Sequence, residues 1–390
     1  MSVSTSAAGA PVVAGVALTQ VRVSPKTIWL FVQVTDAVQA VGVGEATLQR
    51  EEAAVEAVLA RLAPTMLGRA AEPRALADIP LQGQSCAFGA AVSALDHALW
   101  DLAGQRAQQS VAQLLGASAH AIELYANVNR GLPTRDPAAF AQAARGAVEA
   151  GFNAVKIAPF DEIDMFGRWG DAIAPTAKRL ESGLARIAAA RAAVGPDVEL
   201  MVDCHWRFDE ASAQRVIDAC AAFKLYWIEC PIPEERANLP ALKRLRARTH
   251  QHGMLLAGGE DGVGRAAFMP FLTAGAYDVL MPDIKYVGGF AEMRAVAALA
   301  APHGVAIAPH NPTGPVAHMA SLHACAGLPQ FSRLELQFNE SPLFDTLVTP
   351  ALPAPVQGRV AIPHRPGLGA ALAGHEFARH VIRHEIWGVA

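Results

Sequence analysis

Three short apolar runs in the sequence each end in a carboxylate. Asp203 follows Leu-Met-Val, Glu229 follows Tyr-Trp-Ile, and Glu260 follows Leu-Leu-Ala-Gly-Gly. If each run is a strand of a parallel barrel, the three acids lie at its carboxyl-terminal mouth, where barrels of this kind bind ligands. Carboxylate oxygens are hard ligands that suit a hard divalent cation. The pattern therefore predicts a Mg²⁺ site formed by these three side chains.

A histidine lies two positions beyond the first of these acids. Side chains alternate along a strand, so Asp203 and His205 are expected on one face and Cys204 on the other. By the same argument Cys230, which follows Glu229, faces away from the metal and into the layer between the barrel and its helices. We therefore expect both cysteines to pack in the core.

Polar groups also follow three later apolar runs. These groups are Asp283, His310 with Asn311, and Glu335. An aspartate and a histidine on adjacent strand ends can pair, and the carboxylate then fixes the imidazole tautomer and makes His310 a general base. His205 is expected across the mouth, where it can hand a proton to a leaving group. One such residue alone is typical of a polar cap at a barrel rim, but six of them at six strand ends favour a site.

Composition restricts the class of protein. A chain of 390 residues is long enough for two domains or for one large barrel with additions. No apolar run reaches the ~18 to 20 residues of a membrane span, and the small, polar N-terminal residues lack the pattern of a signal peptide. The net charge of −4 gives no reason to expect nucleic acid or a membrane surface as a partner. Five cysteines without a CxxC pair fit a reducing cytoplasm, where we expect the protein to be.

Residues 1–122 are expected to form an α+β unit. Val16–Val23 and Thr27–Val34 are rich in β-branched residues and flank a Ser-Pro-Lys turn, which predicts a hairpin. The Gly-Val-Gly-Glu segment that follows has neither the third glycine nor the lysine of a phosphate loop, so we interpret it as a third strand with glycines for close packing. Helical periodicity predicts two helices in this capping domain, over Glu51–Leu67 and Gly89–Ala103.

Strand and helix patterns alternate from residue 123 to 340. Eight strand segments separated by helical ones fit a modified (β/α)7β barrel of the TIM type better than an open doubly wound sheet, and no GxGxxG follows the first strand. The predicted fold class is therefore α/β, with an α+β capping domain before the barrel. The predicted strands are Glu123–Asn129, Ala154–Ala158, Glu199–His205, Tyr226–Cys230, Leu255–Glu260, Val279–Lys285, Val305–His310 and Arg333–Phe338.

Two further segments lie outside this alternation. Residues 159–176 hold aromatic side chains among acids and predict an extended loop on the active-site face. Residues 341–390 begin Pro-rich and are expected to run back across the capping domain. The predicted domains are thus 1–122, 123–340 and the returning segment 341–390.

The order of domains and the strand-end motifs resemble the enolase superfamily, in its mandelate racemase/muconate lactonizing enzyme branch. The resemblance covers nearly the whole chain, including Ser-Ala-Leu-Asp-His-Ala-Leu-Trp-Asp-Leu from Ser93 and Gly-Phe-Asn-Ala-Val-Lys ending at Lys156. Many members carry Lys-x-Lys at the end of the second barrel strand, with the second lysine as a base. Here the run is Lys-Ile-Ala, so that base is absent. The remaining pattern is similar to that of the galactonate dehydratases.

This resemblance implies a role for each candidate. Asp203, Glu229 and Glu260 would bind the metal, and His310, paired with Asp283, would be the base opposite His205 as the acid. Glu335, if protonated, would hydrogen-bond the substrate carboxylate.

Four further polar residues have alternatives that the sequence leaves open. Lys156 either supplies positive charge near the substrate carboxylate or has a packing or surface role. Asn127, Asn129 and Asn311 are candidate contacts to substrate hydroxyl groups, and the alternative is that they are turn residues.

The sequence thus predicts a Mg²⁺-dependent hydro-lyase that acts on an acid sugar. It would remove the proton α to the carboxylate and expel the β-hydroxyl, through an enediolate, to give a 2-keto-3-deoxy acid. The alternatives are an epimerase or a dehydratase of a non-sugar hydroxy acid and, from another class, a non-catalytic binding or structural barrel. A zinc hydrolase would need His-x-His in the first barrel strand, where Tyr125-Ala-Asn127 stands. We also expect a homo-oligomer, because barrels of this kind often assemble.

Overall fold

The computed structural model describes residues 11–389, and its N-terminal unit is a four-stranded antiparallel sheet covered by helices. Its elements are β1 (Val13–Arg22), β2 (Ile28–Asp36), β3 (Val41–Glu45), α1 (Glu52–Met66), the 3-10 helix η1 (Pro73–Leu76), α2 (Cys86–Ala107), α3 (Val111–Leu114) and the last strand, β15 (Val381–Gly388). The strand order is β15-β1-β2-β3. The predicted hairpin and third strand are confirmed.

Two glycines bring the third strand close to α2. A Cβ atom at Gly42 would lie 2.0 Å from the carbonyl oxygen of Ala98, and one at Gly44 would lie 1.9 Å from that of Ala94. The Gly-Val-Gly segment is therefore a packing feature, as predicted.

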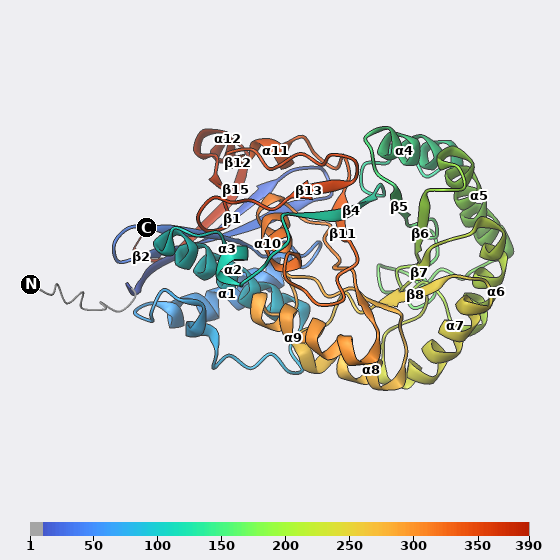
Figure 1. Ribbon diagram of the computed structural model, residues 1–390, viewed down its shortest axis with the longest axis horizontal. Coiled ribbons are helices and arrows are strands. Elements are labelled where there is room, and N and C mark those ends of the chain that lie inside the picture. The colour runs from blue at the N-terminus through green and yellow to red at the C-terminus, as the bar shows by residue number, and fades with distance from the viewer. Residues whose placement is uncertain (1–10, 390) are drawn as a thin grey trace, which may run out of the picture.

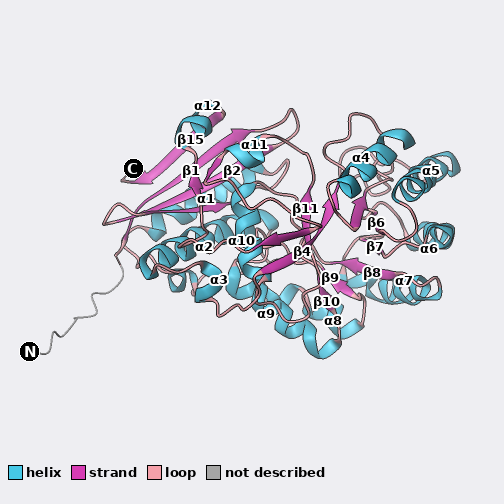
Figure 2. Cartoon of the chain, turned by 45° about the horizontal axis from the view of Figure 1, so that its top comes forward, coloured by secondary structure: helices cyan, strands magenta, loops and turns pink. Residues whose placement is uncertain are grey.

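The larger unit is a parallel barrel with helices on its outside (Figures 1 and 2). The predicted fold class is confirmed. The strands are β4 (Ala121–Asn127), β5 (Ala154–Ile157), β6 (Glu199–Asp203), β7 (Trp227–Glu229), β8 (Leu255–Gly258), β9 (Val279–Leu280), β10 (Ala306–Ile307) and β11 (Leu334–Gln337). The helices between them are α4 (Pro137–Glu149), α5 (Ala177–Val194), α6 (Glu210–Cys220), α7 (Leu239–Gln251), α8 (Met269–Ala274), α9 (Phe290–Ala300) and α10 (Pro315–Cys325), with short 3-10 helices η2 (Ala221–Phe223), η3 (Arg236–Asn238), η4 (Arg265–Ala267) and η5 (Ala301–His303).

The barrel is closed by backbone hydrogen bonds between β10 and the residues just before β11. The strand order runs from β10 through β4 to β11. The N–H of Ile307 donates to the carbonyl oxygen of Gln330, and the N–H of Ser332 donates to that of Ile307, both at 2.9 Å. These bonds join β10 to the segment that leads into β11.

Inward-facing side chains form an apolar layer with a polar layer above it. Tyr125, Met201 and Trp227 belong to a buried cluster inside the barrel, and the rings of Tyr125 and Trp227 meet edge to face at 5.4 Å. Two residues further along β6 and β7, the same face carries Asp203 and Glu229, which are paired in register. Because every second side chain of a strand points into the barrel, the carboxylates lie at the mouth and the apolar layer fills the space below them.

The C-terminal segment lies along both units (Figure 1). It contains α11 (Leu343–Thr346), β12 (Val348–Thr349), β13 (Arg359–Ala361), β14 (Ala371–Leu372) and α12 (Gly374–Arg379) before β15. Strand β13 pairs with β4 of the barrel, and β15 pairs with β1 of the capping sheet. We propose that the domain limits are 1–122, 123–340 and 341–390.

A buried carboxylate joins the two units. Glu45, at the end of β3, accepts hydrogen bonds at 2.8 and 2.9 Å from the N–H groups of Gly314, which caps α10, and of Ala317, in its first turn. The hydroxyl groups of Thr313 and Thr47 donate to the same side chain at 2.8 and 2.7 Å. A negative charge at a helix N-terminus is stabilising. Glu45 thus fixes the start of α10, just after His310, against the capping sheet.

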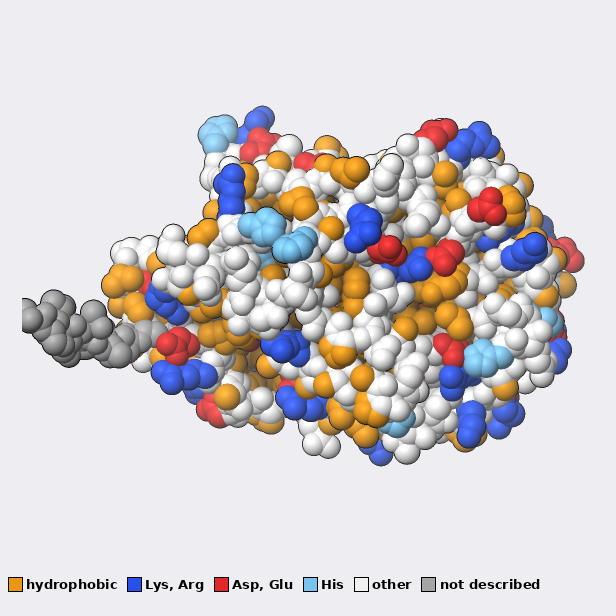
Figure 3. Space-filling model, viewed as in Figure 1, with side chains coloured by type: hydrophobic (Ala, Val, Ile, Leu, Met, Phe, Trp, Pro, Cys, Tyr) orange, Lys and Arg blue, Asp and Glu red, His pale blue; other side chains and the backbone are white. Residues whose placement is uncertain are grey.

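Within residues 11–389, no helix has the length and apolar character needed to cross a membrane. On the face drawn in Figure 3, acidic and basic side chains are interspersed and form no extended block of either sign.

Candidate active site at the barrel mouth

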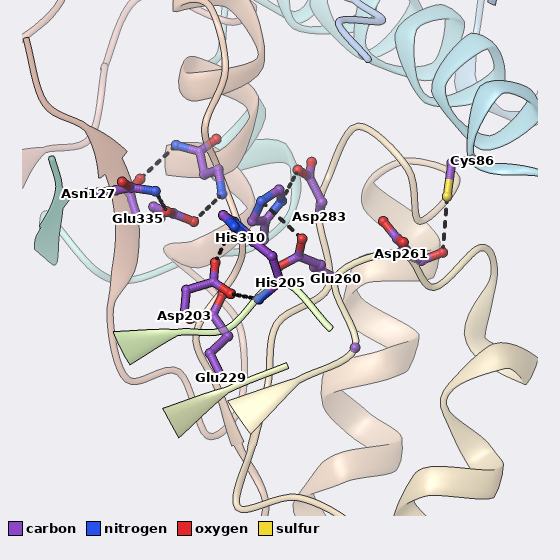
Figure 4. A network of polar contacts seen from close by, with 12 residues as sticks. Cys86, Asn127, Asp203, His205, Glu229, Glu260, Asp261, Asp283, His310 and Glu335 are labelled. Atoms are coloured by element: carbon purple, nitrogen blue, oxygen red, sulfur yellow. Dashed lines mark hydrogen bonds and ion pairs between the residues drawn. The ribbon is translucent and has the colours of Figure 1, made fainter. Parts of the chain in front are cut away.

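The three predicted acids lie at the same end of the barrel (Figure 4), and ligand atoms of Glu229 and Glu260 lie within 4.8 Å of each other, whereas Asp203 is not part of that closest group. Asp203 and Glu229 end β6 and β7, and Glu260 lies two residues beyond β8. Their exposed fractions are 2 %, 0 % and 5 %. Gly259, with φ of +94°, turns the chain toward the mouth, and its N–H donates to the Glu234 side chain at 2.6 Å. This buried cluster is the centre of the candidate site.

The cluster fits a divalent cation. The Oε2 atom of Glu260 is buried and has no hydrogen-bond partner among the described residues. Burial, followed by the charge of Asp203, raises the pKa of Glu229 to about 8 and that of Glu260 well above its ordinary value. A bound cation would offset this repulsion, and oxygen-rich donor sets are typical of Mg²⁺ and Ca²⁺ sites. The protein therefore has a possible acidic metal site here.

Cys230 is fully buried, as predicted, but the prediction that it faces away from the acids was wrong. One ligand atom from each of Glu229, Cys230 and Glu260 lies within 4.8 Å of the other two, so the thiol faces the acids. Strand β7 ends at Glu229, and Cys230 has φ of +45°, so strand alternation does not apply to it. Cys204, in contrast, packs in the large hydrophobic cluster between barrel and helices, as predicted.

Lys156 lies inside the acidic cluster and is fully buried. Its Nζ atom lies 2.7 Å from Glu229 Oε1, 3.0 Å from Glu335 Oε1 and 3.8 Å from Asp203 Oδ2. Although burial opposes the charged form, these carboxylates hold the pKa of Lys156 well above its ordinary value. Of the alternatives that the sequence left open, a surface role is excluded, and Lys156 is a permanent positive charge beneath the mouth.

His205 reaches the site through a turn and not through the predicted strand. Strand β6 ends at Asp203, and His205 and Trp206 have φ of +47° and +57°. The N–H of His205 donates to Asp203 Oδ1 at 2.8 Å, which takes it out of the strand ladder. The ring lies between two carboxylates, with Nε2 3.0 Å from Asp203 Oδ2 and Nδ1 2.9 Å from Asp161 Oδ1. Against the effect of burial, the charges of Asp203 and Asp161 hold the pKa of His205 well above its ordinary value.

The predicted pair of Asp283 and His310 is present on the opposite side of the mouth. His310 Nδ1 lies 2.8 Å from Asp283 Oδ2, and its Nε2 lies 3.6 Å from Glu260 Oε1. Lys285, which sequence reasoning missed, donates from Nζ to Asp283 Oδ2 at 2.7 Å. Burial opposes ionisation, but Lys285 and His310 hold the pKa of Asp283 below its ordinary value. The spacing of two between Asp283 and Lys285 was the available signal.

Glu335 is held by donors that favour its charged form. Asn127 Nδ2 donates to Oε1 at 2.6 Å, and the N–H of Asn311 donates to Oε2 at 3.0 Å. Burial acts in the other direction, but Lys156, His310 and these donors lower the pKa of Glu335. The resemblance implied a bond to the substrate carboxylate only if Glu335 is protonated, and this environment stabilises the charged form instead.

The three asparagines are engaged within the protein. Asn311 is 1 % exposed and bonds through its side chain to the Glu335 carbonyl oxygen, to His318 and to Ser321. Asn127 Oδ1 accepts from the N–H and the side chain of Asn129 at 3.0 and 2.6 Å. These bonds favour the turn and positioning alternative over direct contact with substrate hydroxyl groups.

Sequence reasoning also missed the residues at the rim of the mouth. The Cys86 thiol, at the start of α2, donates to the carbonyl oxygen of Asp261 at 3.3 Å (Figure 4). Arg168 of the 159–176 loop forms an ion pair with the Asp261 side chain and lies 3.8 Å over the ring of Trp206. The capping domain and this loop therefore both border the site.

A closed β/α barrel with buried acids and an Asp–His pair at the carboxyl ends of its strands, and with a capping domain at its mouth, is typical of barrel enzymes. Residues 9–116 match the family "Mandelate racemase / muconate lactonizing enzyme, N-terminal domain", and residues 139–376 match "Enolase C-terminal domain-like". The chain belongs to the enolase superfamily, in its mandelate racemase/muconate lactonizing enzyme branch. The expected family is confirmed.

Individual relatives agree with this assignment. The chain is 31 % identical to the D-galactonate dehydratase of Verminephrobacter eiseniae over 314 residues, which are 78 % of this chain and 77 % of that protein. It is 33 % identical to the D-galactarolactone cycloisomerase of Agrobacterium fabrum over 304 residues, 74 % and 73 % of the two chains. The crystal structure of an enolase protein from Sargasso Sea environmental sequencing has a TM-score of 0.80 and 34 % identity, with 97 % of this chain and 100 % of that one covered.

Proposed function

We propose that the protein is a Mg²⁺-dependent dehydratase of an acid sugar. One observation carries the proposal: two imidazoles, each held by a carboxylate at Nδ1, flank a cluster of three buried acids at the barrel mouth. The similarity to a D-galactonate dehydratase over most of the chain supports the substrate class.

The residues supply a base and an acid on opposite sides of the cluster. His310 Nε2 would take the proton α to the substrate carboxylate, because Asp283 holds Nδ1. The electron pair enters the carboxylate to form an enediolate. It then forms the Cα–Cβ double bond as the β-carbon–oxygen bond breaks, and the hydroxyl leaves as water with a proton from His205. The enol that remains becomes the 2-keto-3-deoxy acid.

The proposed metal ligands are Asp203, Glu229 and Glu260. Bound there, Mg²⁺ would stabilise the negative charge that develops on the substrate carboxylate as the α-proton leaves. We propose that the positive charge of Lys156 and the negative charge of Glu335 offset each other beneath this carboxylate. The three asparagines would then fix Glu335 and the neighbouring turns.

An epimerase remains the second candidate, because an imidazole on each side of the mouth also suits removal and return of a proton on opposite faces. A dehydratase of a non-sugar hydroxy acid would use the same residues. Analysis of the product distinguishes dehydration, which gives a 2-keto acid, from epimerisation, which gives a diastereomer of the substrate; the substrate that is accepted distinguishes an acid sugar from a non-sugar hydroxy acid.

Two substitutions test the division of roles. His310→Asn should abolish both turnover and exchange of the α-proton with solvent deuterium. His205→Asn should lower dehydration by about 100- to 10,000-fold, as expected for a lost general acid, while α-proton exchange remains measurable. The control is His303→Asn, because His303 is exposed at the end of η5 and should not affect either reaction. Equal loss of exchange and dehydration in His205→Asn would contradict the assignment.

We also propose that the protein is a cytoplasmic homo-oligomer. All five cysteines are free thiols, which suits a reducing compartment. The edge strand β15 leaves Ile382 and Ile386 47 % and 43 % exposed, and an apolar open edge favours contact with another chain. Light scattering coupled to size-exclusion chromatography gives the number of chains, and a monomer at all concentrations would rule out the assembly.

A further inference from the structure

Asp161 forms a second Asp–His pair at the mouth, and neither the sequence motifs nor the proposed roles include it. Its Oδ1 atom lies 2.9 Å from Nδ1 of His205. The pair of Asp283 and His310 has the same arrangement, with a carboxylate at Nδ1. In both pairs the second ring nitrogen, Nε2, faces an acid of the cluster, Asp203 at 3.0 Å for His205 and Glu260 at 3.6 Å for His310.

Two arginines fix the Asp161 carboxylate. Arg135 Nη1 lies 3.2 Å from Oδ2, and Arg207 Nη2 lies 3.4 Å from Oδ1. The Arg207 side chain is only 8 % exposed. A carboxylate between two guanidinium groups has little freedom to rotate, so it can hold an imidazole in one orientation.

The packing of Phe160 sets the position of Asp161. Phe160 is 1 % exposed, and its ring meets that of Phe208 edge to face at 5.1 Å. It also presses on α5 at Gly183, where a Cβ atom would lie 2.1 Å from Cε1 of Phe160. The residue before Asp161 is thus locked against both α5 and the segment that carries His205, which limits how far the carboxylate can shift.

We propose that Asp161 is a positioning residue that aims His205 at the leaving hydroxyl group. This inference rests on the proposed function, in which His205 is the acid. Asp161 accepts the Nδ1–H bond and keeps Nε2 as the proton donor. The hydroxyl leaves as water when its bond to carbon breaks and it takes the Nε2 proton, while Asp161 stays ionised throughout.

The 159–176 loop therefore has a second role besides bordering the site, because it carries the residue that positions His205. Asp161 lies near the start of this loop, and Arg168 of the same loop pairs with Asp261 beside the acidic cluster. The side chains of Asp161 and His205 are 30 % and 28 % exposed, so a substrate in the mouth can reach the pair. The docked loop therefore orients the acid of the reaction.

The test compares Asp161→Ala with Asp171→Ala in the full-length protein with Mg²⁺. Asp171 lies in the same loop and is exposed. Asp161→Ala should lower dehydration by about 10- to 100-fold, the usual loss when the carboxylate partner of a functional histidine is removed, and should leave α-proton exchange unchanged. Asp171→Ala should leave both reactions unchanged. Asp161→Glu, which keeps a carboxylate, should recover part of the loss.

A second readout does not depend on the substrate. In protein labelled with ¹⁵N-histidine, the His205 ring signals are identified by their loss in His205→Asn. They should move in Asp161→Ala and stay in place in Asp171→Ala.

Three results would overturn the role of Asp161. These are unchanged dehydration in Asp161→Ala, equal loss of exchange and dehydration, or His205 signals that do not move. If the unmodified protein turns over no acid sugar, the proposed function fails, and the ¹⁵N signals alone decide whether Asp161 positions His205.

Discussion

Mg²⁺ should stabilise this protein more at pH 8 than at pH 6. The reason lies in Glu229, which is fully buried beside Asp203. Burial, and then the negative charge of Asp203, raise its pKa from 4.5 to about 8, and Lys156 opposes this only in part. The side chain that we assign to the metal is therefore protonated in part near neutral pH when no cation is bound.

The sign of the effect follows from comparing the folded and unfolded states. A carboxyl group whose pKa is raised on folding contributes stability below its unfolded value of 4.5, and this contribution is lost as the pH rises through about 8. The full difference between the unfolded and folded pKa values of Glu229 corresponds to at most about 5 kcal/mol in the free energy of unfolding. A bound cation requires the ionised carboxylate, so protons compete with it at pH 6 and much less at pH 8.

Thermal unfolding with EDTA or with Mg²⁺, at pH 6 and at pH 8, measures this competition. A cation at about 100 times its dissociation constant stabilises the folded state by about 2.7 kcal/mol. We expect a rise in Tm with Mg²⁺ at pH 8 and a smaller rise at pH 6. In Glu229→Gln, which cannot ionise, both the rise and its dependence on pH should be reduced.

Two outcomes would refute this reasoning. An equal or larger rise in Tm at pH 6 would mean that no buried carboxyl group is competing with the cation for a proton. The same rise in Glu229→Gln as in the unmodified protein would mean that Mg²⁺ binds elsewhere.

Three further substitutions have expected outcomes. Glu45→Gln should lower the free energy of unfolding by about 1.5 to 3 kcal/mol in urea, since a charged group that accepts four hydrogen bonds is lost; no change would contradict the role of Glu45 in joining the two units. Lys285→Met should cost about 3 to 5 kcal/mol of stability and lower α-proton exchange, because the Asp283 charge is left buried without Lys285; normal exchange would show that Lys285 is not needed by the base. Gly183→Ala should displace Phe160 and lower dehydration more than exchange, which product and deuterium assays compare; equal effects on both would argue against the loop orienting His205.

The fold and the positions of the acids could be predicted because they follow from short-range patterns. Strands of the barrel are apolar on both faces and alternate with amphipathic helices, and a carboxylate at the end of such a strand can lie only near the mouth. Asp203, Glu229 and Glu260 met this condition in the sequence. The pairing of Asp283 with His310 also followed, because their strands are neighbours.

The remaining contacts depend on chain segments without periodicity. The strand that was predicted to include His205 ends at Asp203, whose side chain accepts the N–H of His205. The left-handed backbone of His205 and Trp206 then turns the ring toward Asp161. Cys230 likewise faces the acids because its strand has already ended. Asp161 lies in a loop whose path is set by the packing of Phe160 on distant residues, which no local pattern reports.

The central claim is that this barrel removes an α-proton and expels a β-hydroxyl from an acid sugar. The most direct measurement is a screen of diastereomeric aldonic and aldaric acids with Mg²⁺, in which 2-keto-3-deoxy products are detected. We predict product from one or a few diastereomers that is lost in His310→Asn. A screen without such product, in protein shown to bind Mg²⁺ at Glu229, would contradict the dehydration of acid sugars and favour an epimerase or a non-sugar hydroxy acid.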